Sequence, residues 1–394
     1  MKKYKKNRKK CLKSIGGIIF ISVMLAFLLQ ESTFANDVEN REETVKEEIL
    51  DQLDDREMNQ VLEDIFPEEN LNFKDTVISI LSGEQKMSAE LLWRLSKDQL
   101  TGAFTKSREN LIHILVIAII AAIFHNFSSV LKSKQICEIS FYILYLLLIA
   151  LCLKSFGLVL EWVSAGIGHL TMFMSAFGPI YFLAVSIAKG SVTAVAFYHL
   201  VLFFIYLIEI LIVSVLLPVI HIYIMVKVLD FLSSQEYLSK LAELIEIIVS
   251  WSLKTLLACV VGVNVVQGMI SPAIDTVKRS ALTRTAEAIP GVGDALGGVA
   301  EVVLGTAVLV KNGIGITGLI ICLALCIVPL AQTAMIALMY KLAAALIQPV
   351  SDRRVVGCVE CVGDGCRLLM QVVFTTGLLF LLTIVIVSFV TSSV

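Results

Sequence analysis

The chain has 394 residues, of which 57% are hydrophobic and 17% are charged, and its mean hydropathy is +0.85. Soluble globular proteins carry about 25% charged residues, and an apolar run of about twenty residues is long enough to cross a bilayer. The formal net charge is −2, so there is no basic excess to attract nucleic acid. The composition excludes a soluble domain and a nucleic-acid-binding protein, and it predicts an all-α, polytopic membrane helical bundle.

Residues 1–35 have the features of a secretory signal. Eight Lys or Arg residues within positions 1–13 precede an apolar stretch, 15–29, and small residues follow at Thr33 and Ala35. This order is typical of a signal peptide. We expect cleavage after Ala35 or, as the alternative, an uncleaved anchor, and both would export the segment that follows.

Residues 36–110 form the largest polar segment. Positions 36–75 hold fifteen acidic and four basic residues. Apolar residues at helical spacing predict one helix that ends before Pro67, a second at 73–80 and a third at 91–100. Because such short helices bury only a small core, we expect this acidic helical extracytoplasmic segment to dock on partners or on the membrane body.

Residues 111–394 form the predicted membrane domain, with about seven or eight spans. The stretch 218–232 predicts a short return span, a re-entrant piece or an interfacial helix, and 313–346 is long enough for two spans. The remaining predicted spans are 111–131, 139–160, 167–188, 192–216, 253–270 and 368–390.

The positive-inside rule orients the first half of this domain. With the acidic segment outside, Lys132 and Lys134 fall on the cytoplasmic side after the first span, and Lys189 does so again after the third. The basic groups around Arg279 and Arg353 both favour the cytoplasm. Whether both can lie there depends on how the stretch after Pro218 is counted.

Two units, 178–275 and 290–390, show a similar order of features. Pro218 and Pro329 are 111 residues apart, and Lys254 and Arg367 are 113 apart. Near-constant offsets predict an internal duplication, which is a common way to build transporters and channels.

Ionisable side chains inside the apolar runs are candidate functional residues, because each costs free energy in a membrane unless it is paired or hydrated. Glu209 is the first candidate, since it lies in the middle of a run with Tyr206 on the same helix face. The alternative is hydrogen bonding between helices or snorkelling to the interface. The other candidates are His199, Lys227, Asp230 and Glu301, followed by Lys154, His221 and Lys341.

The segment 289–298 is rich in glycine. A phosphate-binding loop would need Lys and Ser or Thr after its last glycine, and a dinucleotide fingerprint would need a preceding strand. The composition instead favours close helix packing or a re-entrant element. The residues of this element are Pro290, Gly291, Gly293, Asp294, Gly297 and Gly298.

Three of the nine cysteines, Cys358, Cys361 and Cys366, form a C-x2-C-x4-C cluster. No histidine lies nearby and no second pair completes a zinc set, so we expect a structural use. The five histidines form no metalloprotease motif, and no serine elbow is present. The sequence predicts no catalytic, cofactor or metal site, and it does not predict an enzyme.

Several stretches resemble the stage III sporulation protein AE family. They are Glu246–Thr255, Val265–Ala273, Ala288–Gly305 and Lys311–Gly315. The most specific of them is Pro-Gly-Val-Gly-Asp-Ala-Leu-Gly-Gly at 290–298, and the resemblance extends over effectively the whole chain.

The resemblance implies a multi-pass protein of the mother-cell membrane that surrounds the engulfed forespore. It implies as partners the other products of the stage III sporulation A operon, including an ATPase and ring-forming proteins, and a forespore-side channel protein. Their channel complex would support forespore development and late sigma-factor activity. Two alternatives stay open: a stand-alone secondary transporter, and a scaffold that anchors ring components through the acidic segment.

Overall fold

The computed structural model describes residue 50 and residues 54–66, 71–82, 134–188, 191–232, 237–286 and 293–392, with positions 108, 112, 113, 115, 116, 118–120 and 123. All regular structure in these residues is helical, which confirms the all-α prediction. The predicted signal, the helix at 91–100 and most of the span at 111–131 lie outside the described residues.

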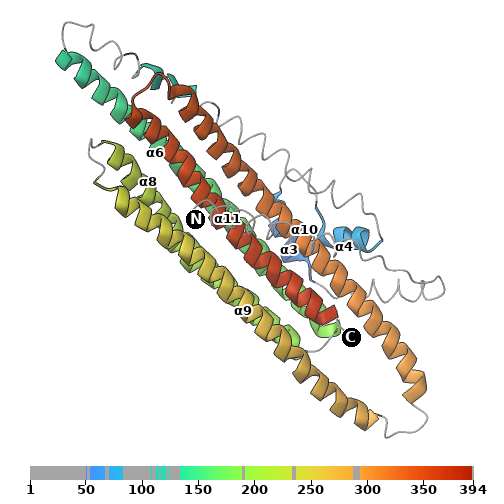
Figure 1. Ribbon diagram of the computed structural model, residues 1–394. Coiled ribbons are helices and arrows are strands. Elements are labelled where there is room, and N and C mark those ends of the chain that lie inside the picture. The colour runs from blue at the N-terminus through green and yellow to red at the C-terminus, as the bar shows by residue number, and fades with distance from the viewer. Residues whose placement is uncertain are drawn as a thin grey trace, which may run out of the picture. The chain divides into compact units, whose positions relative to one another are not determined.

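Long helices make up the body of the unit that begins at Lys46 (Figure 1). Within the described residues, five stretches on them are long and apolar enough to cross a membrane. The helices are α6 (Lys134–Ala188), α7 (Ser191–Leu207) continued by η1 (Ile208–Leu216) and α8 (Leu217–Leu232), α9 (Ser239–Ala286), α10 (Gly293–Ile347) and α11 (Arg353–Ser392).

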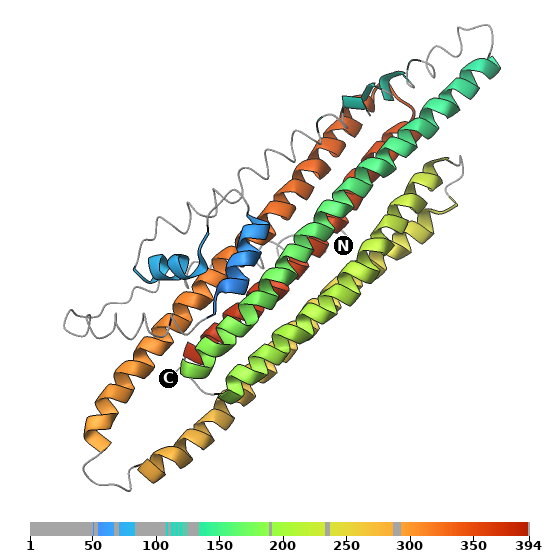
Figure 2. The same ribbon diagram turned by 180° about the vertical axis from the view of Figure 1, so that it is seen from behind.

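Neighbouring helices alternate in direction (Figures 1 and 2). We call the end where α6 begins the proximal end, and it also holds the connections from α8 to α9 and from α10 to α11. The distal end is where α6 and α11 finish. Helices α10 and α11 form the core. Of the most apolar 18-residue stretch of each helix, 72% is buried in α10 and 67% in α11, against 22% in α9. Helix α6 packs on both core helices, whereas α8 and α9 pack on α11.

The structure corrects the predicted division into spans. The runs 139–160 and 167–188 belong to the single helix α6, the run 192–216 continues through Pro218 into α8, and 313–346 lies in α10 alone. A proline costs a helix one donor and crowds a carbonyl, but a full break in apolar surroundings would leave several backbone groups without hydrogen bonds. A π-helical segment, a common site of helix irregularity, directly precedes Pro218.

The continuous helices bear on the predicted orientation, which stays a prediction. Because α6 is one helix, Ala188 lies at the end opposite Lys134, and a single crossing by α6 would place these two ends on opposite sides of the membrane. The positions of Lys278 and Arg279 lie toward the distal end of α9, and α11 begins with Arg353 at the proximal end. The two basic segments therefore lie toward opposite ends of the bundle.

Two short helices of the acidic segment pack on this body. Helix α3 (Arg56–Ile65) ends before Pro67 and contacts α6, and α4 (Phe73–Leu81) contacts α10. Both positions match the predicted helices. The Asn72 side chain caps α4 by accepting a hydrogen bond from the Asp75 backbone at 3.3 Å.

Glycines of α10 allow this close packing. A Cβ on Gly318 would lie 2.3 Å from the ring of Phe177 on α6, and one on Gly313 would lie 2.6 Å from Leu81 of α4. Phe177 in turn meets Phe73 of α4 edge to face, with ring centroids 6.5 Å apart. The absent side chains thus let α4, α6 and α10 meet at one level.

We expect Gly318→Ala to destabilise the protein by about 1–3 kcal/mol, because the added methyl group overpacks the contact with Phe177. Thermal unfolding of the purified protein in detergent measures this. Gly168→Ala on α6 is the control, since its Cβ would meet no atom within 4 Å. Equal unfolding temperatures for the two variants would contradict the packing account.

Candidate functional site: an ionic network between four helices

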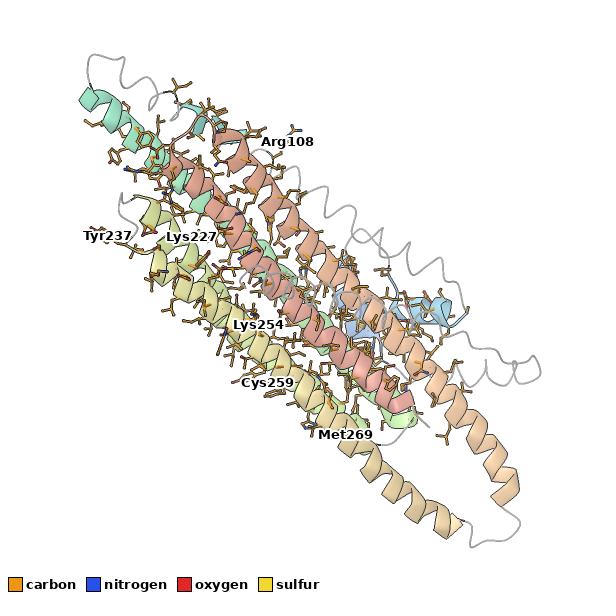
Figure 3. The ribbon with its side chains drawn as sticks, viewed as in Figure 1. Arg108, Lys227, Tyr237, Lys254, Cys259 and Met269 are labelled. Carbon is orange, nitrogen blue, oxygen red and sulfur yellow. The ribbon has the colours of Figure 1, made fainter. Side chains whose placement is uncertain are left out.

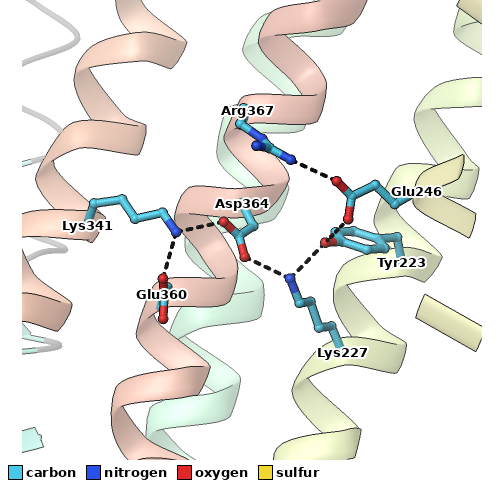
Figure 4. A network of polar contacts seen from close by, with 7 residues as sticks. All are labelled: Tyr223, Lys227, Glu246, Lys341, Glu360, Asp364 and Arg367. Atoms are coloured by element: carbon cyan, nitrogen blue, oxygen red, sulfur yellow. Dashed lines mark hydrogen bonds and ion pairs between the residues drawn. The ribbon is translucent and has the colours of Figure 1, made fainter. Parts of the chain in front are cut away.

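Seven polar side chains form one connected network near the proximal ends of four helices (Figure 4). Hydrogen bonds and ion pairs link them in the order Glu360, Lys341, Asp364, Lys227, Tyr223, Glu246 and Arg367. We call this set the ionic network. It holds three cations and three carboxylates, so its formal charges balance.

Asp364 is the centre of the network. Its Oδ2 atom accepts a hydrogen bond from Lys227 Nζ of α8 and its Oδ1 atom accepts one from Lys341 Nζ of α10, both at 2.7 Å. The side chains of Asp364 and Lys227 are each 26% exposed. One carboxylate of α11 therefore joins lysines from two other helices in a half-buried position.

Two arms extend from this centre. On one side Lys341 also donates to Glu360 at 2.8 Å. On the other side Lys227 donates to the buried Tyr223 hydroxyl at 2.9 Å, and that hydroxyl donates to Glu246 of α9 at 3.4 Å. Arg367 closes this arm through a 2.7 Å contact with Glu246. Charged groups alternate in sign along the network, which offsets the cost of placing them between apolar helices.

Glycines on both sides of Asp364 bring the helices together. A Cβ on Gly363 would lie 3.2 Å from the Lys341 side chain, and one on Gly365 would lie 2.4 Å from Ile224 and 2.6 Å from Phe156. The sequence Gly-Asp-Gly thus combines one carboxylate with the close approach of α6, α8 and α10 to α11.

The two lysines and the two glutamates have equal offsets in the sequence. Lys227 and Lys341 are 114 residues apart, and so are Glu246 and Glu360. In each unit the lysine lies near the end of one helix and the glutamate follows on the next helix. This regularity supports the predicted duplication of 178–275 and 290–390, which stays a prediction.

The structure brings two of the sequence-predicted candidates, Lys227 and Lys341, into the network. Asp230 has a different setting: it is buried, and its Oδ1 atom accepts from the Leu238 backbone at 2.6 Å, directly before α9. Such a contact satisfies a backbone donor at the beginning of a helix. Asp230 therefore secures the connection between α8 and α9.

The other candidates lie apart from the network. Glu209 is exposed on η1, and Ser214 donates to its backbone carbonyl at 3.1 Å. His199 is exposed and contacts the Val195 carbonyl, whereas His221 packs against Phe156 with ring centroids 6.2 Å apart. The functional roles predicted for Glu209, His199 and His221 stay predictions.

The glycine-rich element lies only partly in the described residues. Pro290 and Gly291 fall outside them, and so does the side chain of Glu301. The positions of Gly293, Asp294, Gly297 and Gly298 form the first two turns of α10. Its role in close packing or as a re-entrant element stays a prediction.

Sequence reasoning missed five of the seven network residues as site residues: Tyr223, Glu246, Glu360, Asp364 and Arg367. The predicted candidates are charges inside apolar runs, whereas the missed residues lie near helix ends. The equal 114-residue offsets are the signal that could have drawn attention to Glu246 and Glu360.

Cys358, Cys361 and Cys366 are buried free thiols of α11. Among the described residues, no three His, Cys, Asp or Glu side chains gather in a way that could hold a metal ion.

The described residues thus define a class: an all-helical protein with five candidate membrane spans whose core helices share an ionic network. The chain belongs to the stage III sporulation protein AE family, whose profile matches residues 71–391. It is similar to stage III sporulation protein AE of Bacillus subtilis (strain 168), with 24% identity over 275 residues that cover 70% of this chain and 69% of the relative. No solved structure matches it. The resemblance noted in the sequence is confirmed, and the family implies a role in sporulation.

We expect Asp364→Asn to lower the free energy of unfolding by roughly 1–3 kcal/mol, between the values for exposed and buried ion pairs. The substitution leaves Lys227 without a carboxylate. A double-mutant cycle with Lys227→Gln, followed by thermal unfolding in detergent, measures the coupling between the two residues. Lys240→Gln is the control, because the Lys240–Glu243 pair is exposed. Additive effects of the two network substitutions would contradict the pairing.

Exchanging the charges of Arg367 and Glu246 tests the outer arm. We expect Glu246→Arg to weaken this arm by like-charge repulsion, and Arg367→Glu in the same protein to restore most of the loss. The Glu246 side chain is 33% exposed and that of Arg367 is 56% exposed, so each change in the free energy of unfolding should be within about 1 kcal/mol. The unfolding temperatures of the singles and the double measure it, and a double variant as unstable as the sum of the singles would exclude the contact.

Proposed function

We propose that this chain is the membrane subunit of a channel complex between the mother cell and the forespore. Family membership supports a sporulation role, and the ionic network is the observation that favours a conduit over a passive anchor. An anchor needs only apolar helix contacts, whereas charges between apolar helices cost free energy and commonly mark a path or a gate. Tyr223, Lys227 and Asp364 would form the closed part of that path.

Two levels in the bundle suggest where the membrane lies. Ser155 of α6 and Tyr340 of α10 are hydrogen-bonded at the level of the network, and Phe177 and Gly318 meet at the level of α4. On each helix the two levels are 22 residues apart, or about 33 Å, close to the roughly 30 Å of a hydrocarbon core.

In this placement the proximal end lies in the mother-cell cytoplasm and the acidic segment lies on the other side of the membrane. Exposed acidic residues of α3, among them Glu57 and Glu63, favour water at the distal level. One crossing by the predicted span 111–131 then joins the acidic segment to the start of α6. The operon's ATPase would act at the proximal end, and the ring-forming proteins and the forespore-side channel protein would meet the distal end.

A stand-alone secondary transporter is the second candidate. The equal offsets of Lys227 and Lys341 and of Glu246 and Glu360 favour it, because transporters commonly consist of two related units with a polar site at their junction. A scaffold is the third candidate. Deleting residues 36–110 would abolish assembly of the complex for a scaffold, and a self-sufficient transporter would keep its activity.

The decisive experiment is Asp364→Asn in a sporulating strain that lacks the native protein. We expect normal protein levels and normal co-purification of the other subunits, but late forespore sigma-factor reporter activity as low as in the strain without the protein. The network would then serve passage rather than assembly. Lys240→Gln, an exposed change on α9, should leave the reporter unchanged. Full reporter activity of Asp364→Asn at normal protein levels would exclude a role of the network in passage and favour the scaffold.

A further inference from the structure

The charged side chains on exposed surfaces of the apolar helices include Lys154 and Glu161 on α6, and Lys254 on α9 (Figure 3 labels Lys254). The structure gives none of these three an ionic partner among the described residues. Lipid can cover the apolar side chains around them, but a lone carboxylate or ammonium inside the membrane costs free energy. The two surfaces therefore need a charged neighbour.

Glu161 and Lys254 lie at nearly the same height in the bundle. Phe156 of α6 packs on His221 of α8, and Tyr223, two residues further along α8, hydrogen-bonds Glu246 of α9. Because α6 and α8 run in opposite directions, the levels of residues 154 and 246 correspond. Glu161 lies seven residues beyond the first level and Lys254 eight beyond the second, so their heights differ by about 1.5 Å.

A second pair repeats the match closer to the proximal end. Lys154 lies seven residues before Glu161 on α6, and Glu243, which also forms an exposed ion pair with Lys240 of its own helix, lies eleven before Lys254 on α9. Seven and eleven residues are both close to whole turns, so each helix carries its two charges on one stripe. From the proximal end, the α6 stripe is positive and then negative, and the α9 stripe is negative and then positive.

These stripes cannot easily pair within one chain. Helices α7, α8 and α11 each contact both α6 and α9 and so lie between them. The predicted span 111–131 contains no Asp, Glu, Lys or Arg, so it cannot neutralise Lys154 or Glu161. A second copy in the same membrane, however, presents its α9 stripe at the required height and with complementary charge.

We propose that copies of this chain associate head to tail, with the α6 stripe of one copy against the α9 stripe of the next. Glu161 pairs with Lys254 inside the membrane, and Lys154 pairs with Glu243 at the level of the ionic network. Because the two stripes are different surfaces, the contact is heterologous, and such a contact gives a ring where its rotation closes. This inference does not depend on what the protein transports.

Two oppositely charged variants of the full-length protein test the contact. The Glu161→Lys protein has a cation at both position 161 and position 254, and the Lys254→Glu protein has a carboxylate at both positions. Each variant alone should lose self-association roughly tenfold or more, because every contact then joins like charges. When both are co-expressed with different tags, each interface between unlike copies again joins a cation and a carboxylate. Co-purification from membranes in mild detergent should return to the level of the unchanged protein.

The matched control co-expresses Lys254→Glu with a copy that carries both Lys254→Glu and Glu209→Lys, since Glu209 is also an exposed carboxylate of a candidate span. Every contact in this mixture still joins two carboxylates, so it should show no recovery. Recovery with Glu209→Lys but not with Glu161→Lys would overturn the assignment. Association unaffected by Glu161→Lys and by Lys254→Glu would overturn the proposal, and so would recovery only when both changes are in the same chain.

A disulfide gives a second readout that does not depend on reversed charges. Gly168 of α6 and Ala258 of α9 are exposed and follow the two stripes toward the distal end. Cysteines at both positions, with exposed Cys259 replaced by Ser, should form cross-linked dimers and higher ladders on mild oxidation of membranes. The absence of ladders in a protein that co-purifies with itself would place the interface elsewhere and overturn the proposal.

Discussion

The arrangement of the core helices depends on Asp364 and the two lysines that it holds. A single charge between apolar helices would be costly, and Lys227, Lys341 and Asp364 offset one another only if α8, α10 and α11 stay at fixed height and rotation. The flanking Gly363 and Gly365 provide the close approach that these short contacts need. The network therefore fixes the register of the bundle at its proximal end, where apolar packing alone would permit sliding.

At the distal level the bundle is fixed by a different kind of contact. Gly313 and Gly318 of α10 accept Leu81 of α4 and Phe177 of α6. The docked helices α3 and α4 also bring the acidic segment against the membrane body. The two ends of the bundle therefore differ in chemistry, with an ionic network at the proximal end and a glycine–aromatic contact at the distal level.

The possible neighbours of the protein differ from one face to another. The α6 and α9 stripes offer matched charges to a second copy, whereas α3 and α4 carry exposed acidic residues at the distal level.

The sequence by itself determined the class of the protein: apolar runs and low charge predicted an all-helical membrane body, helical spacing located α3 and α4, and the motifs around 290–298 indicated the family. It could not determine where one helix ends and the next begins, because Pro218 and Pro329 have the same local signature in a continuous helix as at a break. Nor could it assemble the site. Lys227 was recognisable as a charge in an apolar run, but its partner Asp364 is 137 residues away, and only the packing of α8 against α11 brings them together. Local rules describe residues within a few turns of each other, whereas ion pairs between helices depend on the register and rotation of whole helices, which the tertiary structure alone decides.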